Sequence, residues 1–349
     1  MVQTKKRVVS IDAAKAICVL LVIYGHTFRE SMREAYTWCN LSYIFVYRFH
    51  VSTLFLLSGM GYTLTAQKNR GLSAGQYLRK KAHSLLLPWI SYSALIYLVF
   101  ALVQIFPPVR ALLAGTSYQL VSPVQYVWLL LRNENPYSFH LWYLQTLFLF
   151  TVVTALLEHV LPPKTARRVL LALLILLPGF YQLFCRTWVW TFKGFFQQYA
   201  FFLLGVLLPR EKAEQHARAL LLLGLVCGPY VLRELFFPQL LLSEGFLDTY
   251  LHYGTIAGLG LGIWAACVLL QEHLQRLARF GQNSMLFYLY HQPFCCALVG
   301  MLLYDKLHFS AVGTVLVCMV VSLVVPYLIH KLAGLLHLRP VLQRLGLPG

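Results

Sequence analysis

The chain has 349 residues, of which 59% are hydrophobic and only 12% are charged. Its mean hydropathy of +0.65 excludes a soluble globular protein of this length, so a polytopic membrane protein is expected. The net charge of +17 comes from short basic clusters between apolar segments, which argues against a nucleic-acid-binding face. The eight cysteines show no paired metal-ligand spacing, so no metal or redox site is expected.

Apolar runs of about 20 residues define the expected transmembrane segments. Ten are expected, the sixth being short: 8–28, 43–66, 84–106, 141–160, 168–185, 195–209, 218–237, 250–271, 283–303 and 311–331. A glycine run at 254–262 lies inside the eighth segment and predicts close helix packing rather than a phosphate loop. The predicted fold is an all-α transmembrane bundle in which residues 1–349 form one integral-membrane domain, with its core at about 7–331 and no appended soluble domain.

The distribution of Lys and Arg predicts the orientation of the bundle. Basic clusters at 79–81, 164–168 and 210–218 lie in loops on one side, while most acidic loop residues lie on the other. The positive-inside rule then places both termini in the cytoplasm. The longest outer loop, at about 107–140, is rich in Tyr, Trp and Ser, which fits ligand recognition and membrane-interface anchoring equally well.

The first segment carries three ionisable residues, Asp12, Lys15 and His26. An ionisable residue in hydrocarbon costs a few kcal/mol or more, so it marks a functional site by default. Lys15 and His26 are eleven residues apart, which is almost a whole number of helical turns, so both project from one face at roughly 16 Å separation. Asp12 lies one turn before Lys15, where it can neutralise that charge. The pattern predicts a polar stripe with a charge pair at its cytoplasmic end and an imidazole at its outer end.

Later segments carry further histidines into the membrane. The second segment starts outside and brings His50 to the level of His26. The sequence HLWY at 140–143 opens the fourth segment, as an interfacial aromatic anchor or as part of a site. His291 lies about eight residues into the ninth segment. A lone buried histidine is usually structural, but His291 joins other intramembrane polar residues, which favours a functional role.

A basic group lies at the cytoplasmic entrance of the third segment: Arg79, Lys80, Lys81 and His83. It could bind an anionic ligand, or it could serve only as the positive charge that sets the orientation of the segment. The remaining histidines lie at segment ends or in loops and are expected to be structural: His159, His216, His273, His308, His330 and His337. The chain has no HExxH, GxSxG or paired CxxC motif, so metallohydrolase and serine-esterase functions have no support.

Four motifs occur in order on the predicted segments. They are D-x-x-K-x10-H at 12–26, FHVSTLFLLSGMGY at 49–62, LWYL at 141–144 and G-x-x-S-x-x-x-Y-x-x-H-x-P at 281–293. This set resembles the acyltransferase 3 family of integral-membrane acyltransferases, whose members move an acyl group, often acetyl, from a cytoplasmic donor to a sugar or other acceptor at the outer side. The resemblance covers about residues 7–331 and is closest to compact members such as fucose 4-O-acetylase-like proteins. Lys15 stands where many members have Arg.

The resemblance implies roles for individual residues. His26 is expected as general base or as transient carrier of the acyl group, with the two routes left open. The implied groups are His26, Asp12 and Lys15 for catalysis; His50, Ser58, Trp142, Tyr143 and His291 for positioning the acceptor or thioester; Lys15, Arg79, Lys80 and His83 for the donor; and no metal. The expected partners are an acyl-CoA donor, namely acetyl-CoA, a glycan or lipid-linked sugar acceptor and the lipid bilayer, without nucleic acid; a homo-oligomer is left open. A bacterial inner membrane is implied.

The main alternative is a proton-coupled transporter that uses Asp12, Lys15, His26 and His291 as a relay. The same stripe would serve proton movement, although no inverted repeat is visible in the sequence. A purely structural membrane subunit is a third hypothesis, and it leaves the polar stripe unexplained.

Overall fold

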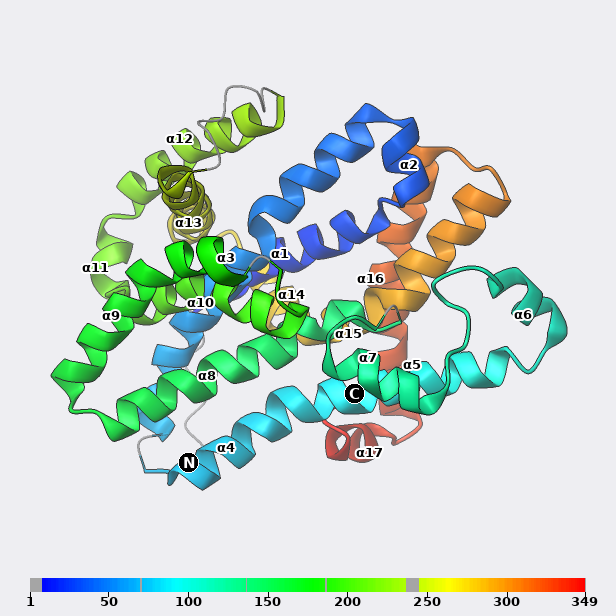
Figure 1. Cartoon of the computed structure of the whole chain (residues 1–349), viewed down its shortest axis with the longest axis horizontal. Helices are drawn as coiled ribbons and strands as arrows, with labels where there is room; N and C mark the ends of the chain where they lie inside the picture. The colour runs from blue at the N-terminus through cyan, green and yellow to red at the C-terminus, as the bar shows by residue number, and fades with distance from the viewer. Residues whose placement is uncertain (1–7, 70, 136, 186, 237–244, 349) are drawn as a thin grey trace.

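A computed structural model describes residues 8–69, 71–135, 137–185, 187–236 and 245–348 (Figure 1). Over these ranges the chain is helical and contains no strand, so the predicted all-α class is confirmed. The predicted cytoplasmic N-terminus and the end of the predicted seventh segment, at residue 237, lie outside the described residues.

The helices of the first half include two short ones within the long loop at 107–140. They are α1 (Val9–Thr27), α2 (Glu30–Ala35), α3 (Thr37–Asn69), α4 (Ala74–Lys81), η1 (Ala82–Leu86), α5 (Leu87–Val103), α6 (Pro107–Leu113), α7 (Pro123–Leu131), η2 (Phe139–Leu141) and α8 (Trp142–Val160). The second half comprises α9 (Pro163–Phe180), η3 (Tyr181–Cys185), α10 (Trp190–Leu207), α11 (Arg210–Gln215), α12 (Ala217–Phe236), α13 (Phe246–Leu269), α14 (Gln275–Gln282), α15 (Ser284–Tyr290), η5 (His291–Leu298), η6 (Met301–Lys306), α16 (Ala311–Leu335) and α17 (Arg339–Arg344).

Eight helical stretches of the described chain are long and apolar enough to cross a membrane. They are Val9–Thr27, Thr37–Ala66, Ala74–Val103, Phe139–Val160, Pro163–Cys185, Phe246–Leu269, Ser284–Lys306 and Ala311–Leu335. Each coincides with one of the ten predicted segments. The other two predicted segments fall on α10 and α12, which are helical but not among these eight, so the count of ten stays a prediction.

Short-range side-chain bonds mark where several helices begin. Ser73 and Gln76 form a capping box at α4, in which each side chain accepts a hydrogen bond from the other residue's backbone N–H, at 3.3 and 2.9 Å. Ser122 and Ser310 cap α7 and α16 in the same way with one bond each. The long apolar stretches between such caps form helices because a helix satisfies its own backbone hydrogen bonds in hydrocarbon.

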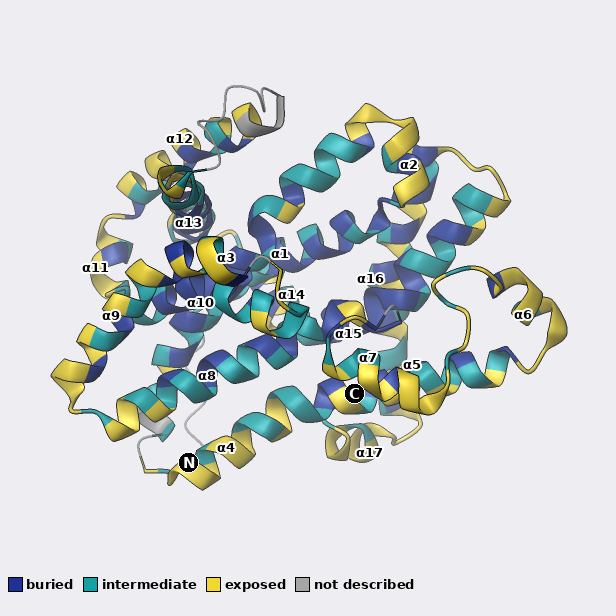
Figure 2. Cartoon of the chain, in the orientation of Figure 1, coloured by how far each residue is buried: buried dark blue, intermediate teal, exposed yellow. Residues whose placement is uncertain are grey.

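The first helix and the segment that begins with α15 form the centre of the bundle. In their most apolar windows 56% of α1 and 67% of Ser284–Lys306 are buried, against 28% for Pro163–Cys185 and for α16. Figure 2 shows the difference as dark blue along α1 and mixed colours on the outer helices. α1 is therefore a central helix, and its polar residues Asp12, Lys15 and His26 are partly buried.

The glycine run on α13 brings that helix close to two others, which confirms the predicted packing role. A Cβ atom at Gly258 would lie 2.5 Å from Cys227 Sγ of α12, and one at Gly262 would lie 2.6 Å from the Cα of Gly224. At Gly260 the added atom would lie 2.8 Å from a side-chain atom of α3. A larger residue at any of these positions would push α13 away from its neighbours.

The loop at 107–140, predicted to lie outside, folds back onto the bundle through its tyrosines. Tyr137 is 1% exposed, and its ring stacks on Phe100 and Tyr126 with centroid distances of 4.8 and 5.8 Å. Trp128 is 60% exposed. The buried tyrosines thus attach the loop to the bundle, and an interfacial role for its Trp stays a prediction.

The C-terminal segment packs at the start of α5. A Cβ atom at Gly346 would lie 2.9 Å from Pro88 Cδ, and Leu347 is buried. In Figure 1, α17 lies beside α5, which continues directly from the basic α4. The C-terminal segment therefore contacts the helix that follows the basic cluster at 79–81, and both segments are predicted to be cytoplasmic.

Candidate active site

Four histidines from four elements lie around the end of α1, and we call them the histidine cluster: His26, His50, His140 and His291. The ring centroids of His26 and His291 are 5.2 Å apart, and those of His291 and His140 are 5.3 Å apart. The ring of Tyr47 lies between His26 and His50, at 5.9 and 5.1 Å. His50, which was predicted to lie at the level of His26, and His291 therefore both lie near His26 in the structure.

Backbone carbonyls fix the orientation of the His291 ring. Its Nδ1 lies 3.1 Å from the carbonyl oxygen of Phe287 and 2.8 Å from that of Tyr288. A carbonyl can only accept, so Nδ1 carries the proton. Nε2 of the neutral ring is then an unprotonated nitrogen, and it is buried without a hydrogen-bond partner among the described residues. A ring in this state can accept a proton or a hydrogen bond.

His50 and His140 are oriented by the same kind of contact. His50 Nδ1 lies 2.5 Å from the carbonyl oxygen of Val46, and His140 Nε2 lies 3.3 Å from that of Leu289. Both histidines are almost fully buried. In their neutral forms each keeps one unprotonated nitrogen, on the side away from the carbonyl.

His26 differs from the other three because its partner is a side chain. The hydroxyl of Tyr47 lies 3.2 Å from His26 Nδ1. A hydroxyl can donate or accept, so the tautomer of His26 can change while this contact is kept. The ring of Tyr47 approaches α1 over Gly25, where an added Cβ would lie 2.8 Å from Tyr47 Cε2. Glycine at this position therefore makes room for the ring.

A layer of hydroxyl groups connects the cluster to α3 and α8. Ser58 Oγ lies 2.7 Å from the hydroxyl of Tyr143. The ring of Tyr143 packs edge-on against Tyr288 at 5.6 Å, and the Tyr288 hydroxyl donates to the backbone carbonyl of His140. Ser58 and Tyr143 therefore contact the cluster through Tyr288.

Trp142 packs against aromatic rings of α3 and α10. Its ring lies 5.5 Å from that of Trp190 and 5.8 Å from that of Phe55, and an added Cβ on Gly194 would lie 3.3 Å from it. Trp142, the first residue of α8, thus packs between α3 and α10. A role in orienting the acceptor or the thioester stays a prediction.

The other end of the stripe carries Asp12 and Lys15, both half-buried. Asp12 Oδ2 is buried without a hydrogen-bond partner among the described residues. A Cβ atom on Gly281 would collide with the backbone carbonyl of Asp12, so α14 packs directly on α1 here. An added Cβ on Gly61 would lie 3.7 Å from Lys15 Nζ, which places the amine against α3.

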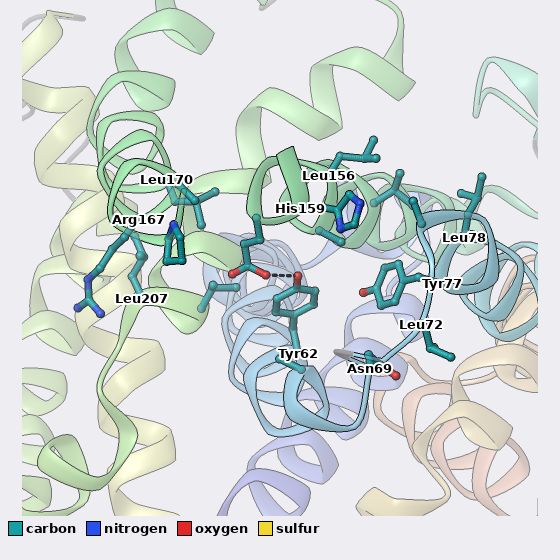
Figure 3. Close-up of a pocket in the computed structure, with 18 of the residues that line it drawn as sticks. Tyr62, Asn69, Leu72, Tyr77, Leu78, Leu156, His159, Arg167, Leu170 and Leu207 are labelled. Carbon is teal, nitrogen blue, oxygen red and sulfur yellow. Dashed lines mark hydrogen bonds between the residues drawn. The ribbon is translucent and has the colours of Figure 1, made fainter. Parts of the chain in front are cut away.

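A cavity of about 910 Å³ opens at this end, between α3, α4, α8, α9 and α10. Figure 3 shows Tyr62 and Tyr77 directed into it, with Arg167 at one side. Tyr62 donates a hydrogen bond of 2.6 Å to Glu158 Oε2. Tyr62 directly follows Gly61, so the cavity lies at the level of Lys15 on α3.

The three residues predicted to bind the donor from the third segment, Arg79, Lys80 and His83, are exposed on α4 and η1. Lys80 Nζ donates 2.8 Å to Asn69 Oδ1, and Asn69 lines the cavity. Neither Arg79 nor His83 is among the described residues that line it. The structure therefore brings only Lys80 to the rim of the cavity.

No group of three or more His, Cys, Asp or Glu side chains in the described ranges is placed to hold a metal ion. In particular, the histidine cluster is not such a group.

A family model, described as an acyltransferase domain, matches residues 8–331. The chain belongs to the acyltransferase 3 family. No curated protein and no solved structure matches the chain significantly. Together with the apolar helices, membership shows an integral-membrane acyltransferase. The histidine cluster and the cavity both lie within the matched residues.

Several residues near these features were not predicted as functional. Tyr47 gave no signal beyond its position three residues before His50, which places both on one helix face. For His140 the sequence shows only that it opens the aromatic stretch at 140–143, which fits an interfacial anchor or part of a site. His159 was expected to be structural, yet it lines the 910 Å³ cavity beside Glu158.

Proposed function

We propose that the protein transfers an acetyl group from cytoplasmic acetyl-CoA to a hydroxyl of a sugar in a cell-surface glycan or its lipid-linked precursor, across a bacterial inner membrane. One observation supports this most: within an acyltransferase 3 chain, three buried histidines surround the partly buried His26 at the predicted outer end of α1. A partly exposed imidazole beside further unprotonated ring nitrogens suits proton removal from a hydroxyl.

In the proposed reaction His26 Nδ1 donates its hydrogen to the oxygen of Tyr47, which leaves Nε2 unprotonated. Nε2 takes the proton of the acceptor hydroxyl while the oxygen attacks the thioester carbonyl. The C–S bond breaks, and the proton passes to the leaving thiolate of coenzyme A. His291, whose Nε2 is unpartnered in the described structure, is available to hold the acceptor hydroxyl or the transferred proton.

The donor is proposed to enter from the Asp12 end of α1. The charged nucleotide would lie near Lys15 and Lys80, with the 910 Å³ cavity and Arg167 beside it. Phosphate groups bind cationic side chains. Lys interacts as a point charge, whereas Arg can form two parallel hydrogen bonds to one phosphate. The pantetheine arm would then follow α1 over the roughly 16 Å between Lys15 and His26. Its thioester would end at the histidine cluster.

The experiment that tests the proposal is transfer of radiolabelled acetyl from acetyl-CoA to membrane glycan in inside-out vesicles. His26→Ala removes the proposed base, so the transfer rate should fall at least ~100-fold, the scale of general-base catalysis. His216→Ala, at an exposed histidine of the α11–α12 junction, is the matched control and should keep the wild-type rate. Wild-type ester levels in His26→Ala, with correct folding, would contradict the assignment.

The same assay separates transfer from the alternative of proton-coupled transport. Transfer consumes acetyl-CoA and leaves a new ester on the glycan. Transport moves the acceptor without a covalent change. A wild-type protein that accumulates sugar in vesicles but esterifies none of the acceptors offered would favour the transporter.

A further inference from the structure

A second cavity, of about 460 Å³, lies along the first part of α3, at residues 47–52, whereas the first cavity contacts α3 at residues 62–69; we call it the α3–α13 cavity. It is bounded by α3, η3, α10, α12 and α13. Polar side chains dominate its wall: Arg48, Ser52, Gln182, Gln197, Gln198 and Asp248. Its volume falls within the ~300–1,000 Å³ typical of small-molecule sites.

This cavity and the histidine cluster share a wall. Tyr47 lines the cavity, and its hydroxyl lies 3.2 Å from His26 Nδ1. Arg48, Val51 and Ser52 follow Tyr47 on α3 and line the same space. A molecule in the cavity is therefore separated from the ring of His26 by one tyrosine side chain.

The wall offers hydrogen-bonding groups of both kinds. The amides of Gln182 and Gln197 can donate and accept. Gln198 is held in place by Ser52, whose hydroxyl donates to its Oε1 at 2.8 Å. Asp248 Oδ2 is buried and has no hydrogen-bond partner among the described residues, so it can accept from a hydroxyl of a bound molecule.

The cavity also presents aromatic surface. Tyr253 and Phe201 stack with centroids 5.1 Å apart and ring planes 4° apart, and both line the wall. The two formally charged groups in the described lining, Arg48 and Asp248, have opposite signs. A lining with mixed donors and acceptors, apolar ring faces and balanced charge suits a molecule with many hydroxyls and no net charge.

We infer that the α3–α13 cavity binds the acceptor as a neutral, hydroxyl-rich sugar unit, an assignment that rests on the proposed acyl transfer. The hydroxyl to be esterified would point past Tyr47 to His26. The amides and Asp248 would hold the other hydroxyls, and thereby decide which hydroxyl reaches the base.

A kinetic test compares Asp248→Asn with wild type. The variant keeps the shape of the side chain but removes its charge, so the KM for the glycan acceptor should rise about tenfold, the size of one charge-assisted hydrogen bond. The KM for acetyl-CoA should stay unchanged. Glu272→Gln, at an exposed position beyond α13, is the matched control and should match wild type in both constants. An unchanged acceptor KM in Asp248→Asn would overturn the assignment.

A binding test works without catalysis and so separates the two proposals. Thr249→Cys places a thiol in the cavity wall, while the eight native cysteines are all buried. The rate of labelling by a methanethiosulfonate reagent is measured in the His26→Ala background. At least one of the neutral methyl glycosides of glucose, galactose, fucose and N-acetylglucosamine should slow labelling several-fold, whereas glucose 6-phosphate should not.

The outcomes of the binding test are distinct. Labelling that no neutral glycoside slows, or that glucose 6-phosphate slows equally, would overturn the sugar site even if wild type transfers acetyl groups normally. Protection by a neutral glycoside in a protein that never transfers acetyl would support the site and contradict the proposed transfer.

Discussion

Hydrogen-bond partners distinguish the four histidines of the cluster more clearly than their positions do. Three rings face backbone carbonyls, which fix one tautomer. His26 faces Tyr47, which can exchange roles as donor and acceptor. The sequence pointed to His26 because an ionisable residue in an apolar helix stands out. Tyr47 could not be predicted, because tyrosine is common near membrane surfaces and its contact with α1 depends on how α3 packs.

Tyr47→Phe tests whether the hydrogen bond from the Tyr47 hydroxyl to His26 supports the proposed role of His26 as the general base. The change keeps the ring over Gly25 and removes the hydrogen bond to His26 Nδ1. A neutral hydrogen bond contributes about 0.5–1.5 kcal/mol, so kcat for acetyl transfer should fall roughly 2- to 12-fold. The KM for acetyl-CoA should not change.

Tyr43→Phe provides the control for Tyr47→Phe. It removes a hydroxyl from the ring that packs against Tyr47 one turn earlier on α3, and it should leave kcat at the wild-type value. Equal rates for Tyr47→Phe and wild type would show that the Tyr47 hydroxyl does not support the reaction.

Close contacts between helices decide where the elements place these side chains. A Cβ atom on Gly59 would collide with the carbonyl of Phe202, and one on Gly205 would collide with the carbonyl of Leu56. The two glycines thus let α3 and α10 touch backbone to backbone. The glycine run of α13 could be predicted as a packing site from sequence. The pairing of Gly59 with Gly205 could not, because glycine spacing does not identify the partner helix.

Gly59→Ala tests whether the close contact between α3 and α10 stabilises the fold. Without the close approach α3 and α10 must separate, and overpacking of this kind costs about 1–3 kcal/mol. The midpoint of thermal unfolding in detergent should fall by several degrees. Gly254→Ala, on α13 where an added Cβ meets no described atom within 4 Å, should leave the midpoint unchanged or raise it slightly, since Ala favours a helix. A similar change in both variants would contradict a specific role of the Gly59 contact.

For the whole molecule, apolar length predicted the helical bundle and the approximate position of every long helix. Hydropathy could not predict which helices are central, because α1 and α16 are both apolar while α1 is buried and α16 faces outward. The lining of the proposed donor site could not be predicted from the sequence either. Basic residues before the third segment were visible in the sequence, but the 910 Å³ cavity draws its lining from five helices, and Glu158, His159 and Arg167 reach it only in the folded chain.

The separation of the two ends along α1 leads to a prediction about sidedness. If the donor binds at the Asp12 end and the acceptor at the His26 end, acetyl transfer is vectorial. Acetyl-CoA is highly charged and does not cross hydrocarbon. Inside-out vesicles given external radiolabelled acetyl-CoA should therefore label glycan on their inner surface, while sealed right-side-out vesicles should not.

Permeabilising the right-side-out vesicles should restore labelling, which controls for the amount of active protein. If sealed vesicles of both orientations label equally, donor and acceptor enter from the same side. The stripe between Lys15 and His26 would then not be the path of the acyl group, and the basic end of the bundle would serve orientation alone.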